Sequence, residues 1–504
     1  MRQLIILAIL YSICDATEPQ QNKRDQLLRD EALMALGGKT TLTDKEEIVN
    51  NCLMKHKFQE LDYAFDNPRY FNFSHHFFSY KDQIKQSKVY RIIKDMPKGA
   101  VLHMHDIAIL GPDYILNATY MDNLYVCFDG DQLKMRFSTS TPSIPCNEKW
   151  QLMSDARRAA ASVKEFDAKL RKRFTLLVDE PDKVYPSITE SWTTFMEYFG
   201  TVSQLITYRP LWEQYFYDAL KQFRESNIMY IEVRSTLPSL YELDGTVYEP
   251  LITAKSYKKA IVRFVKDYPD FVGAKLIFAP SRKVSRETVG ESIALAKRIK
   301  SEIPDHFAGF DLVGQEDLGE PLVVFLPELT EAKKDLEFFF HAGETDWYGC
   351  PTDENILDAI LLGTKRLGHA YALSKHPLLM KEVVARDIGV EVNVISNAVL
   401  SLVRDVRNHP LSVYLANGMP VVLSCDDPGA WEADVISDDF YVAFVGVASR
   451  LADIKLLKAL ALNSLKYSAL SGTEKDNTIK KFNERWNDFV RRRMDSTLNR
   501  LTYV

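Results

Sequence analysis

The sequence predicts an α/β fold, a closed (β/α)8 barrel of TIM type. Short apolar runs rich in β-branched residues recur along the chain, and each is followed by a longer helical pattern. This alternation implies right-handed βαβ units and a parallel sheet, and eight units match a barrel of about 250 residues plus insertions. An open doubly wound sheet is the alternative, but no Gly-rich dinucleotide motif follows the first run. The runs span residues 100–105, 228–234, 272–279, 309–313, 338–344, 366–370, 390–396 and 420–426.

The composition is that of a globular protein with room for more than the barrel. The chain has 504 residues, of which 46% are hydrophobic and 26% charged. Its 63 Lys and Arg against 69 Asp and Glu give a net charge of −6. A nucleic-acid partner is not expected, because binding phosphates requires a basic excess.

The first residues predict a signal peptide at residues 1–16. Arg2 precedes an apolar run at residues 4–11, and the small residue Ala16 follows at cleavage distance. A membrane anchor is the alternative, but the run is shorter than the roughly 20 residues of a bilayer span, and Asp15 closes it. No later stretch is long and apolar enough to span. We therefore expect a secreted, extracellular protein without a membrane span.

The cysteines and two sequons fit an oxidising compartment. Removing the signal peptide takes away Cys14 and leaves five cysteines, which cannot all pair within one chain. Cys127 and Cys146 are close together in a turn-rich stretch, so we expect a disulfide between them; the other three are expected to be small buried residues. Asn72 and Asn117 head sequons and are predicted glycosylation sites.

Two regions lie outside the barrel pattern. Residues 17–97 carry apolar residues at helical spacing and almost no strand-like run, so this region is predicted to be helical. The apolar face of this region must be buried either on the barrel or on a second copy of the chain. A homodimer is therefore one hypothesis. Within the barrel domain, residues 98–504, the stretch 123–182 is rich in turn residues and then helical at 155–173. It is read as an inserted subdomain, since long structureless loops are uncommon.

Histidines and an acid stand at the ends of predicted strands. His103 and His105 lie two apart and share one face of a strand, although such a pair alone is weak evidence. His341 ends the fifth run together with Glu344, and Gly343 between them allows the chain to turn so that both side chains face one spot.

Paired carboxylates end the eighth run. Asp426 and Asp427 follow a buried strand and would repel each other unless a cation lies near them. The carboxyl ends of all barrel strands meet at one mouth, so His103, His105, His341 and Asp426 are expected to form one metal site. Three nitrogens and one oxygen suit Zn²⁺ better than Mg²⁺ or Ca²⁺, and zinc would supply hydroxide from water.

Two further groups complete the predicted site. Glu344 is placed to move protons beside the metal. His369 follows Gly368 at the end of the sixth run, where it could orient the attacking hydroxide, although an ordinary buried histidine is the alternative.

These motifs, in this order, resemble the adenosine deaminase family. The similarity is closest to its secreted branch, the adenosine deaminase-related growth factors or type-2 adenosine deaminases, and it covers nearly the whole mature chain. The segments that carry it are His103-Met104-His105, Gly309-Phe310-Asp311-Leu312-Val313-Gly314, His341-Ala342-Gly343-Glu344-Thr345-Asp346-Trp347, Leu367-Gly368-His369 and Ser424-Cys425-Asp426-Asp427-Pro428.

The resemblance implies a barrel of the metal-dependent hydrolase kind that converts adenosine, and 2′-deoxyadenosine, to the inosine form and ammonia. It implies one Zn²⁺ per chain, with Glu344 donating a proton to purine N1 and His369 positioning the hydroxide. It further implies that Asp427 hydrogen-bonds N7 and the Gly314 N–H meets N3. Residues 17–97 resemble a dimerisation domain, and 123–182 resemble a receptor-binding domain. The implied zinc ligands are His103, His105, His341 and Asp426.

Two positions depart from the family pattern, and other functions remain open. Ala370 stands where glycine is common, and Cys425 where serine or threonine is usual; both are small, so altered packing and no loss of chemistry is expected. A related zinc hydrolase acting on another amino-purine or AMP is one alternative. A growth factor that uses the barrel as a scaffold for a cell-surface receptor is another. A proteoglycan could bind at residues 491–493, although three arginines on a terminal helix are usually a solvated face.

Overall fold

Eight short parallel strands form the centre of the computed structural model, which describes residues 20–130 and 132–501. They are arranged in two sheets, with orders β1-β5-β6-β7 and β11-β10-β9-β8. Two isolated parallel bridges join these sheets: Phe310 pairs with Phe338, and Met104 pairs with Asp426 between the first and last strands. The predicted barrel is confirmed. Its strands are β1 (Gly99–Val101), β5 (Ile228–Ser235), β6 (Gly273–Phe278), β7 (Phe307–Phe310), β8 (His341–Ala342), β9 (Arg366–His369), β10 (Gly389–Val392) and β11 (Val421–Leu423).

The barrel strands form where the sequence has its apolar runs, but several are shorter than expected. All eight residues of β5 are buried, as expected for parallel strands covered on both faces. The run 390–396 leaves the sheet after Val392 and continues as a short helix from Val394. Only two residues of 338–344 are in regular strand. The chain departs from the ladder at the mouth, where polar side chains replace apolar ones.

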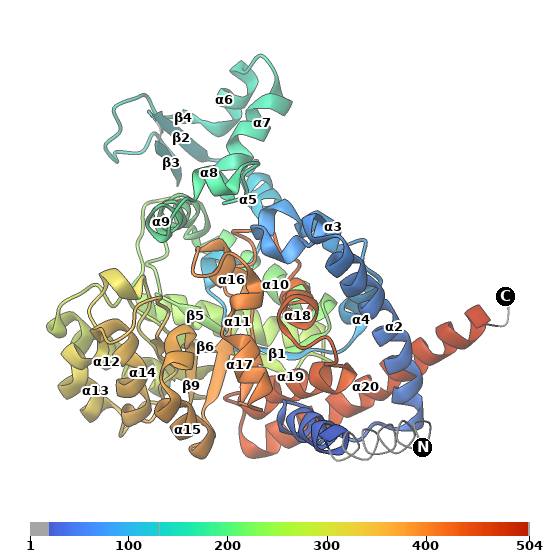
Figure 1. Cartoon of the computed structure of the whole chain (residues 1–504). Helices are drawn as coiled ribbons and strands as arrows, with labels where there is room; N and C mark the ends of the chain where they lie inside the picture. Colours follow the sequence, from blue (N-terminus) through green and yellow to red (C-terminus); the bar gives the residue numbers. More distant parts are fainter. Residues whose placement is uncertain (1–19, 131, 502–504) are drawn as a thin grey trace, which may run out of the picture.

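Helices alternate with the strands and surround them (Figure 1). Most begin with a proline in the first turn or a capping side chain; for example, Ser285 Oγ accepts from the Thr288 N–H at the start of α12. The helices of the barrel domain are α5 (Pro112–Ala118), α9 (Ile188–Ile206), α10 (Arg209–Glu225), α11 (Pro250–Asp267), α12 (Arg286–Glu302), α13 (Leu326–Ala332), α14 (Pro351–Leu362), α15 (Pro377–Ala385), α16 (Val394–Val399), α17 (Leu411–Ala416), α18 (Ser437–Tyr441), α19 (Ile454–Lys466) and α20 (Gly472–Leu501).

The N-terminal region is helical and packs against the last two helices. It contains a helix over 20–34, α2 (Asp44–Asp66), α3 (Lys81–Ile84) and α4 (Lys88–Asp95). In α2, Glu46 accepts from Lys458 Nζ at 2.7 Å and from Trp486 Nε1 at 2.8 Å. The buried Lys57 donates to the Ser449 carbonyl at 2.9 Å. One face of α2 is therefore buried on the barrel domain, the first of the two options that its sequence left open.

A small subdomain between β1 and β5 stands away from the barrel (Figure 1). An antiparallel sheet of order β3-β2-β4 is followed by helices, and Arg171 ties the subdomain back through Asp113 at 2.7 Å and Glu432 at 2.9 Å. The expected helix at 155–173 is broken into two. The elements are β2 (Leu124–Asp129), β3 (Gln132–Phe137), β4 (Gln151–Leu152), α6 (Met153–Ala159), α7 (Val163–Arg171) and α8 (Pro181–Val184).

The cysteines follow the prediction in part. Cys127 and Cys146 form the expected disulfide, which ties β2 to the loop before β4. Of the remaining three, only Cys425 is fully buried; Cys52 and Cys350 are half-buried.

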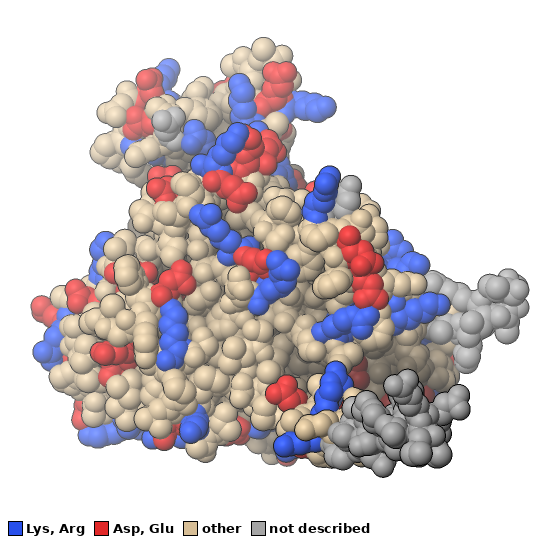
Figure 2. Space-filling model, viewed as in Figure 1, with Lys and Arg blue, Asp and Glu red and all other residues tan. Residues whose placement is uncertain are grey.

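The predicted signal peptide, residues 1–16, lies outside the described residues. Among the described helices, none has the length and apolar character that a membrane crossing requires. On the face shown in Figure 2, acidic and basic side chains are interspersed, with broad uncharged areas between them.

Candidate metal centre and active site

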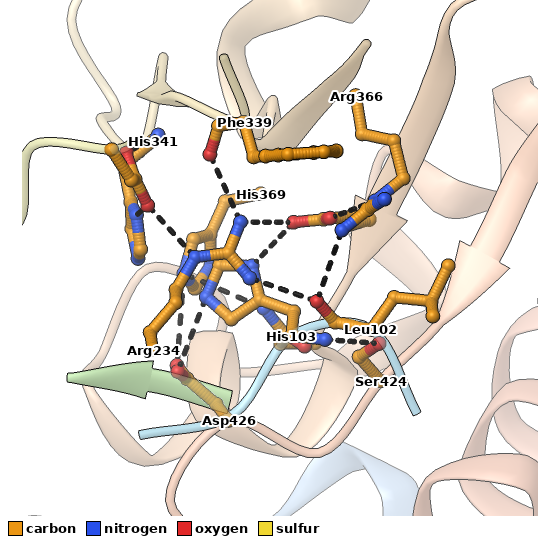
Figure 3. Close-up of polar contacts among 12 residues, drawn as sticks. Leu102, His103, Arg234, Phe339, His341, Arg366, His369, Ser424 and Asp426 are labelled. Carbon is orange, nitrogen blue, oxygen red and sulfur yellow. Dashed lines mark hydrogen bonds and ion pairs between the residues drawn. The ribbon is translucent and has the colours of Figure 1, made fainter. Parts of the chain in front are cut away.

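The predicted site residues gather at the carboxyl end of the barrel. His103 and His105 follow β1, His341 begins β8, His369 ends β9, and Asp426 follows β11. The carboxyl ends of parallel barrel strands form one mouth, and Figure 3 shows the side chains of His103, His341, His369 and Asp426 close together there.

The side chains form overlapping groups of possible metal ligands: His103 groups with His105 and Asp426, whereas His341 groups with His103 and His369. Asp426 Oδ1 lies 3.4 Å from His103 Nε2 and 3.2 Å from His105 Nε2. The ring centroids of His103 and His341 are 4.5 Å apart, and those of His105 and His341 are 5.3 Å apart. In each of three groups, the ligand atoms lie within 4.8 Å of one another. The groups are His103, His341 and His369; His103, His105 and Asp426; and Glu344, His369 and Asp426.

The unpaired atoms of this cluster fit a cation. His103 Nε2 and Asp426 Oδ1 are both buried and have no hydrogen-bond partner. A buried polar atom without a partner costs about 1–3 kcal/mol, and a metal ion between the two would remove that cost. Imidazole nitrogens with one carboxylate oxygen are a donor set that suits Zn²⁺.

Two of the imidazoles are oriented by carboxylates on their far side. His103 Nδ1 lies 2.7 Å from Glu391 Oε2, and His341 Nδ1 lies 2.6 Å from Asp311 Oδ2. An N–H at Nδ1 leaves Nε2 unprotonated and available to a metal. Burial lowers the pKa of His341 to about 3, so this imidazole is neutral near pH 7.

Glu344 is a buried acid with a raised pKa. Burial, followed by the negative charges of Asp426 and Glu316, raises the pKa of Glu344 well above its usual range. Its Oε1 has no hydrogen-bond partner, while its backbone N–H donates to Glu316. A carboxyl with a raised pKa and an unpartnered oxygen beside these imidazoles is suited to giving a proton to a bound molecule.

His369 lies between Glu344 and Asp426, one of the predicted metal ligands. Its Nδ1 is 3.4 Å from Glu344 Oε1 and its Nε2 is 3.6 Å from Asp426 Oδ2. The amides of Asn397 and Asn393 are 3.2 and 3.4 Å from Nδ1 and Nε2. Burial lowers the pKa of His369 well below its usual range, so the ring is neutral and can accept a hydrogen bond.

Asp427 directly follows Asp426 after β11, and Gly314 lies in the segment after β7. Burial and the adjacent Asp426 carboxylate raise the pKa of Asp427 well above its usual range, and Asp427 Oδ1 has no partner. Gly314 has φ +108 and open space where a Cβ would be. A carboxyl that keeps its proton and a backbone N–H are both hydrogen-bond donors.

The backbone at the site is strained. His369, Ala370 and Asp426 have φ of 58, 45 and 57, in the left-handed region. Each such residue costs about 1–3 kcal/mol, and such positions cluster at functional sites. Ala370, which departs from the family's common glycine, therefore occupies a conformation that glycine adopts without cost.

The sequence suggested Glu232 as a pocket wall and gave no role to the other charged residues within the strands; Glu232 instead pairs with Arg366. Arg234, Arg366, Glu232 and Glu391 are fully buried in β5, β9 and β10, and Asp311 follows β7. The sequence did contain a clue to these residues, because charged residues within buried apolar strands require partners.

The fold and the clustered imidazoles define a class, the metal-dependent hydrolases built on a (β/α)8 barrel. Comparison with known families identifies which one. Residues 171–485 match the family model described as adenosine deaminase, and residues 2–93 match the model described as adenosine/AMP deaminase N-terminal.

Similar proteins agree over nearly the full chain. The chain is 39% identical to human adenosine deaminase 2 over 493 residues, covering 96% of each chain. It is 41% identical over 474 residues to adenosine deaminase of Aedes albopictus, covering 93% of this chain and 88% of that protein. The chain belongs to the adenosine deaminase family and is a hydrolase of the deaminase type.

Solved structures support the fold. The N6-mAMP deaminase of arabidopsis is similar with a TM-score of 0.57 at 18% identity, covering 78% of this chain and 99% of that one. The adenine deaminase of Arthrobacter aurescens gives a TM-score of 0.55 at 18% identity, covering 77% and 98%.

Proposed function

We propose that this protein is a secreted, zinc-dependent adenosine deaminase that converts adenosine and 2′-deoxyadenosine to inosine and 2′-deoxyinosine, with release of ammonia. The observation that carries the proposal is the pair of buried acids, Glu344 and Asp427, each with an unpartnered oxygen beside the imidazole cluster. Burial and neighbouring carboxylates also raise the pKa of both acids. Relatives named adenosine deaminase or adenosine deaminase 2 over most of the chain support the substrate.

The four side chains that would hold zinc are His103, His105, His341 and Asp426. When bound there, Zn²⁺ would lower the pKa of a water ligand to about 7 and thereby supply hydroxide at neutral pH.

The protein's own groups would act on the purine. Glu344 donates its proton to N1, which draws electron density from C6 and prepares that carbon for attack. His369 accepts a hydrogen bond from the attacking oxygen and fixes its direction. Asp427 donates to N7 and the Gly314 N–H donates to N3, which holds the ring in its plane. A C–O bond forms at C6 and the C6–N bond breaks. Of the two protons of water, one leaves with the amino group as ammonia and the other restores Glu344.

The remaining regions receive roles by the same resemblance. Residues 1–16 would direct secretion, which fits the Cys127–Cys146 disulfide. Residues 17–97 would form a homodimer: Phe65 on α2 is 85% exposed, and grooves of about 950 and 850 Å³ flank that helix.

The subdomain at 123–182 would bind a cell-surface receptor.

The two predicted glycosylation sites differ in exposure: Asn117 is exposed, whereas Asn72 is half-buried. A proteoglycan site at residues 491–493 has less support, because Arg491 pairs with Asp488, and Arg492 and Arg493 pair with Asp95.

The test combines metal analysis with a spectroscopic assay. Purified protein should contain about one zinc per chain, and added adenosine or 2′-deoxyadenosine should show the ultraviolet change of conversion to the inosine form, whereas AMP should react far more slowly. The proposed substrate would be refuted if the folded, metal-loaded protein did not convert adenosine but did convert AMP or another amino-purine. Secretion and dimerisation are tested by the protein's recovery from culture medium and by sedimentation.

A further inference from the structure

A single arginine inside the barrel contacts the partners of two predicted metal ligands. Arg234 lies in β5 and its side chain is completely buried. It is central among the contacts drawn in Figure 3. Nothing in the proposed chemistry uses it, yet a buried guanidinium is costly unless its N–H groups are all well placed.

Arg234 shares its acceptors with the two imidazoles. Its Nε lies 2.7 Å from Asp311 Oδ2, the same oxygen that receives His341 Nδ1 at 2.6 Å. Its Nη2 lies 2.8 Å from Glu391 Oε2, the same oxygen that receives His103 Nδ1 at 2.7 Å. One rigid, planar group thus sets the positions of both carboxylates that orient these imidazoles.

The remaining contacts of Arg234 reach the backbone beside the same two histidines. Nη1 donates to the carbonyl of Leu102 at 2.9 Å, directly before His103. Nη2 also donates to the carbonyl of Phe339 at 3.0 Å, two residues before His341. The guanidinium therefore holds each of these histidines both through its side chain and through its main chain.

The buried carboxylates and guanidinium groups around Arg234 have a charge balance that suits a cation beside the imidazoles. Glu391 also pairs with Arg366, which in turn pairs with Glu232. The three carboxylates of Asp311, Glu391 and Glu232 form ion pairs with the two guanidinium groups of Arg234 and Arg366, and none of these five side chains has exposed surface. These three carboxylates exceed the two guanidinium groups by one charge, which favours a cation nearby.

We propose that Arg234 is a positioning residue of the metal site: through Asp311 and Glu391 it fixes the orientation and tautomer of His341 and His103, and so raises the affinity for the metal without touching it. The inference rests on the ligand set proposed above. Lysine cannot replace it, because a compact ammonium cannot bridge two carboxylates and two carbonyls in fixed directions.

The test compares metal binding by the full-length parental protein with Arg234→Lys, Asp311→Asn and Glu391→Gln. Arg157→Lys is the matched control, since Arg157 is a buried, ion-paired arginine in the subdomain, 2.8 Å from Asp167. Zinc and cobalt dissociation constants are measured by chelator competition, the visible absorption of the cobalt form reports ligand geometry, and circular dichroism checks the fold.

The three network variants should bind zinc about 10- to 100-fold more weakly and show an altered cobalt spectrum, while the control stays within about 2-fold of the parental value. Loaded to saturation, Arg234→Lys should lose kcat for adenosine with little change in KM. A folded Arg234→Lys with parental affinity and spectrum would overturn the inference. If that variant fails to fold, parental affinity in both Asp311→Asn and Glu391→Gln would overturn it instead. A parental protein that binds no metal would refute the proposed function itself.

Discussion

The replacement Glu344→Gln separates proton donation from every other property of the site. Burial and neighbouring acids raise the pKa of Glu344 well above its usual range, which favours the protonated carboxyl, and glutamine has nearly the same shape as that group. Since Oε1 has no partner within the protein, no internal hydrogen bond at that atom is lost. We expect the free energy of unfolding and the zinc content to remain close to the parental values.

The kcat of Glu344→Gln for adenosine should nevertheless fall steeply. Glutamine can hydrogen-bond N1 but cannot protonate it, and a positioned general acid contributes about 10²–10⁴-fold, or about 3–5 kcal/mol of the barrier. The assay is the loss of adenosine absorbance at saturating substrate, with metal analysis and thermal unfolding on the same sample. The exposed Glu320→Gln is the control and should behave as the parental protein. A metal-loaded Glu344→Gln that turns over adenosine at the parental rate would show that the acid lies elsewhere.

Three further perturbations probe other parts of the chain. Asp427→Asn keeps a donor toward N7 and should lose less kcat/KM than Asp427→Ala, which removes it; equal losses in steady-state assays would argue against that hydrogen bond. The pKa of Glu46 is lowered to about 2 because the Lys458 ion pair and other hydrogen bonds outweigh burial, so its contribution to stability is present above pH 4.5 and lost as the pH falls toward 2. Glu46→Gln should therefore reduce the free energy of unfolding by about 2 kcal/mol at pH 7, and denaturation curves should show this difference shrinking below pH 4.5; a difference independent of pH would contradict the assignment. Replacing Cys127 and Cys146 with serine should expose residues 124–184 to proteases at a stability cost of about 2–4 kcal/mol, whereas adenosine turnover by intact chains should change little; a matching loss of activity would instead show that the subdomain supports the site.

The eight-stranded barrel was predictable because its signal is local. Each apolar run followed by a helical pattern marks one unit, and the placement of His341, His369 and Asp426 at strand ends follows from that pattern. The period of two also placed His103 and His105 on one face, although regular strand ends before them at Val101.

The carboxylate and guanidinium network could not be assigned from the sequence alone. The contact between Arg234 and Glu391 joins residues 157 apart in sequence, and the partners become definite only once the barrel is closed. The left-handed backbone of His369 and Asp426 was equally inaccessible, since neither residue prefers that conformation and the surrounding structure imposes it.

The seam between the first and last strands has a consequence for how the protein matures. His105 N–H donates to the Asp426 carbonyl, and Asp426 N–H donates to the His103 carbonyl, both at 3.2 Å. The only backbone ladder across this seam in the described residues is thus formed by residues that also offer ligand atoms. A nascent chain that has not yet produced β11 lacks Asp426, so the ligand set proposed above is complete only after the last strand docks. A bound ion would then link the segments after the first and last strands and stabilise the closed barrel.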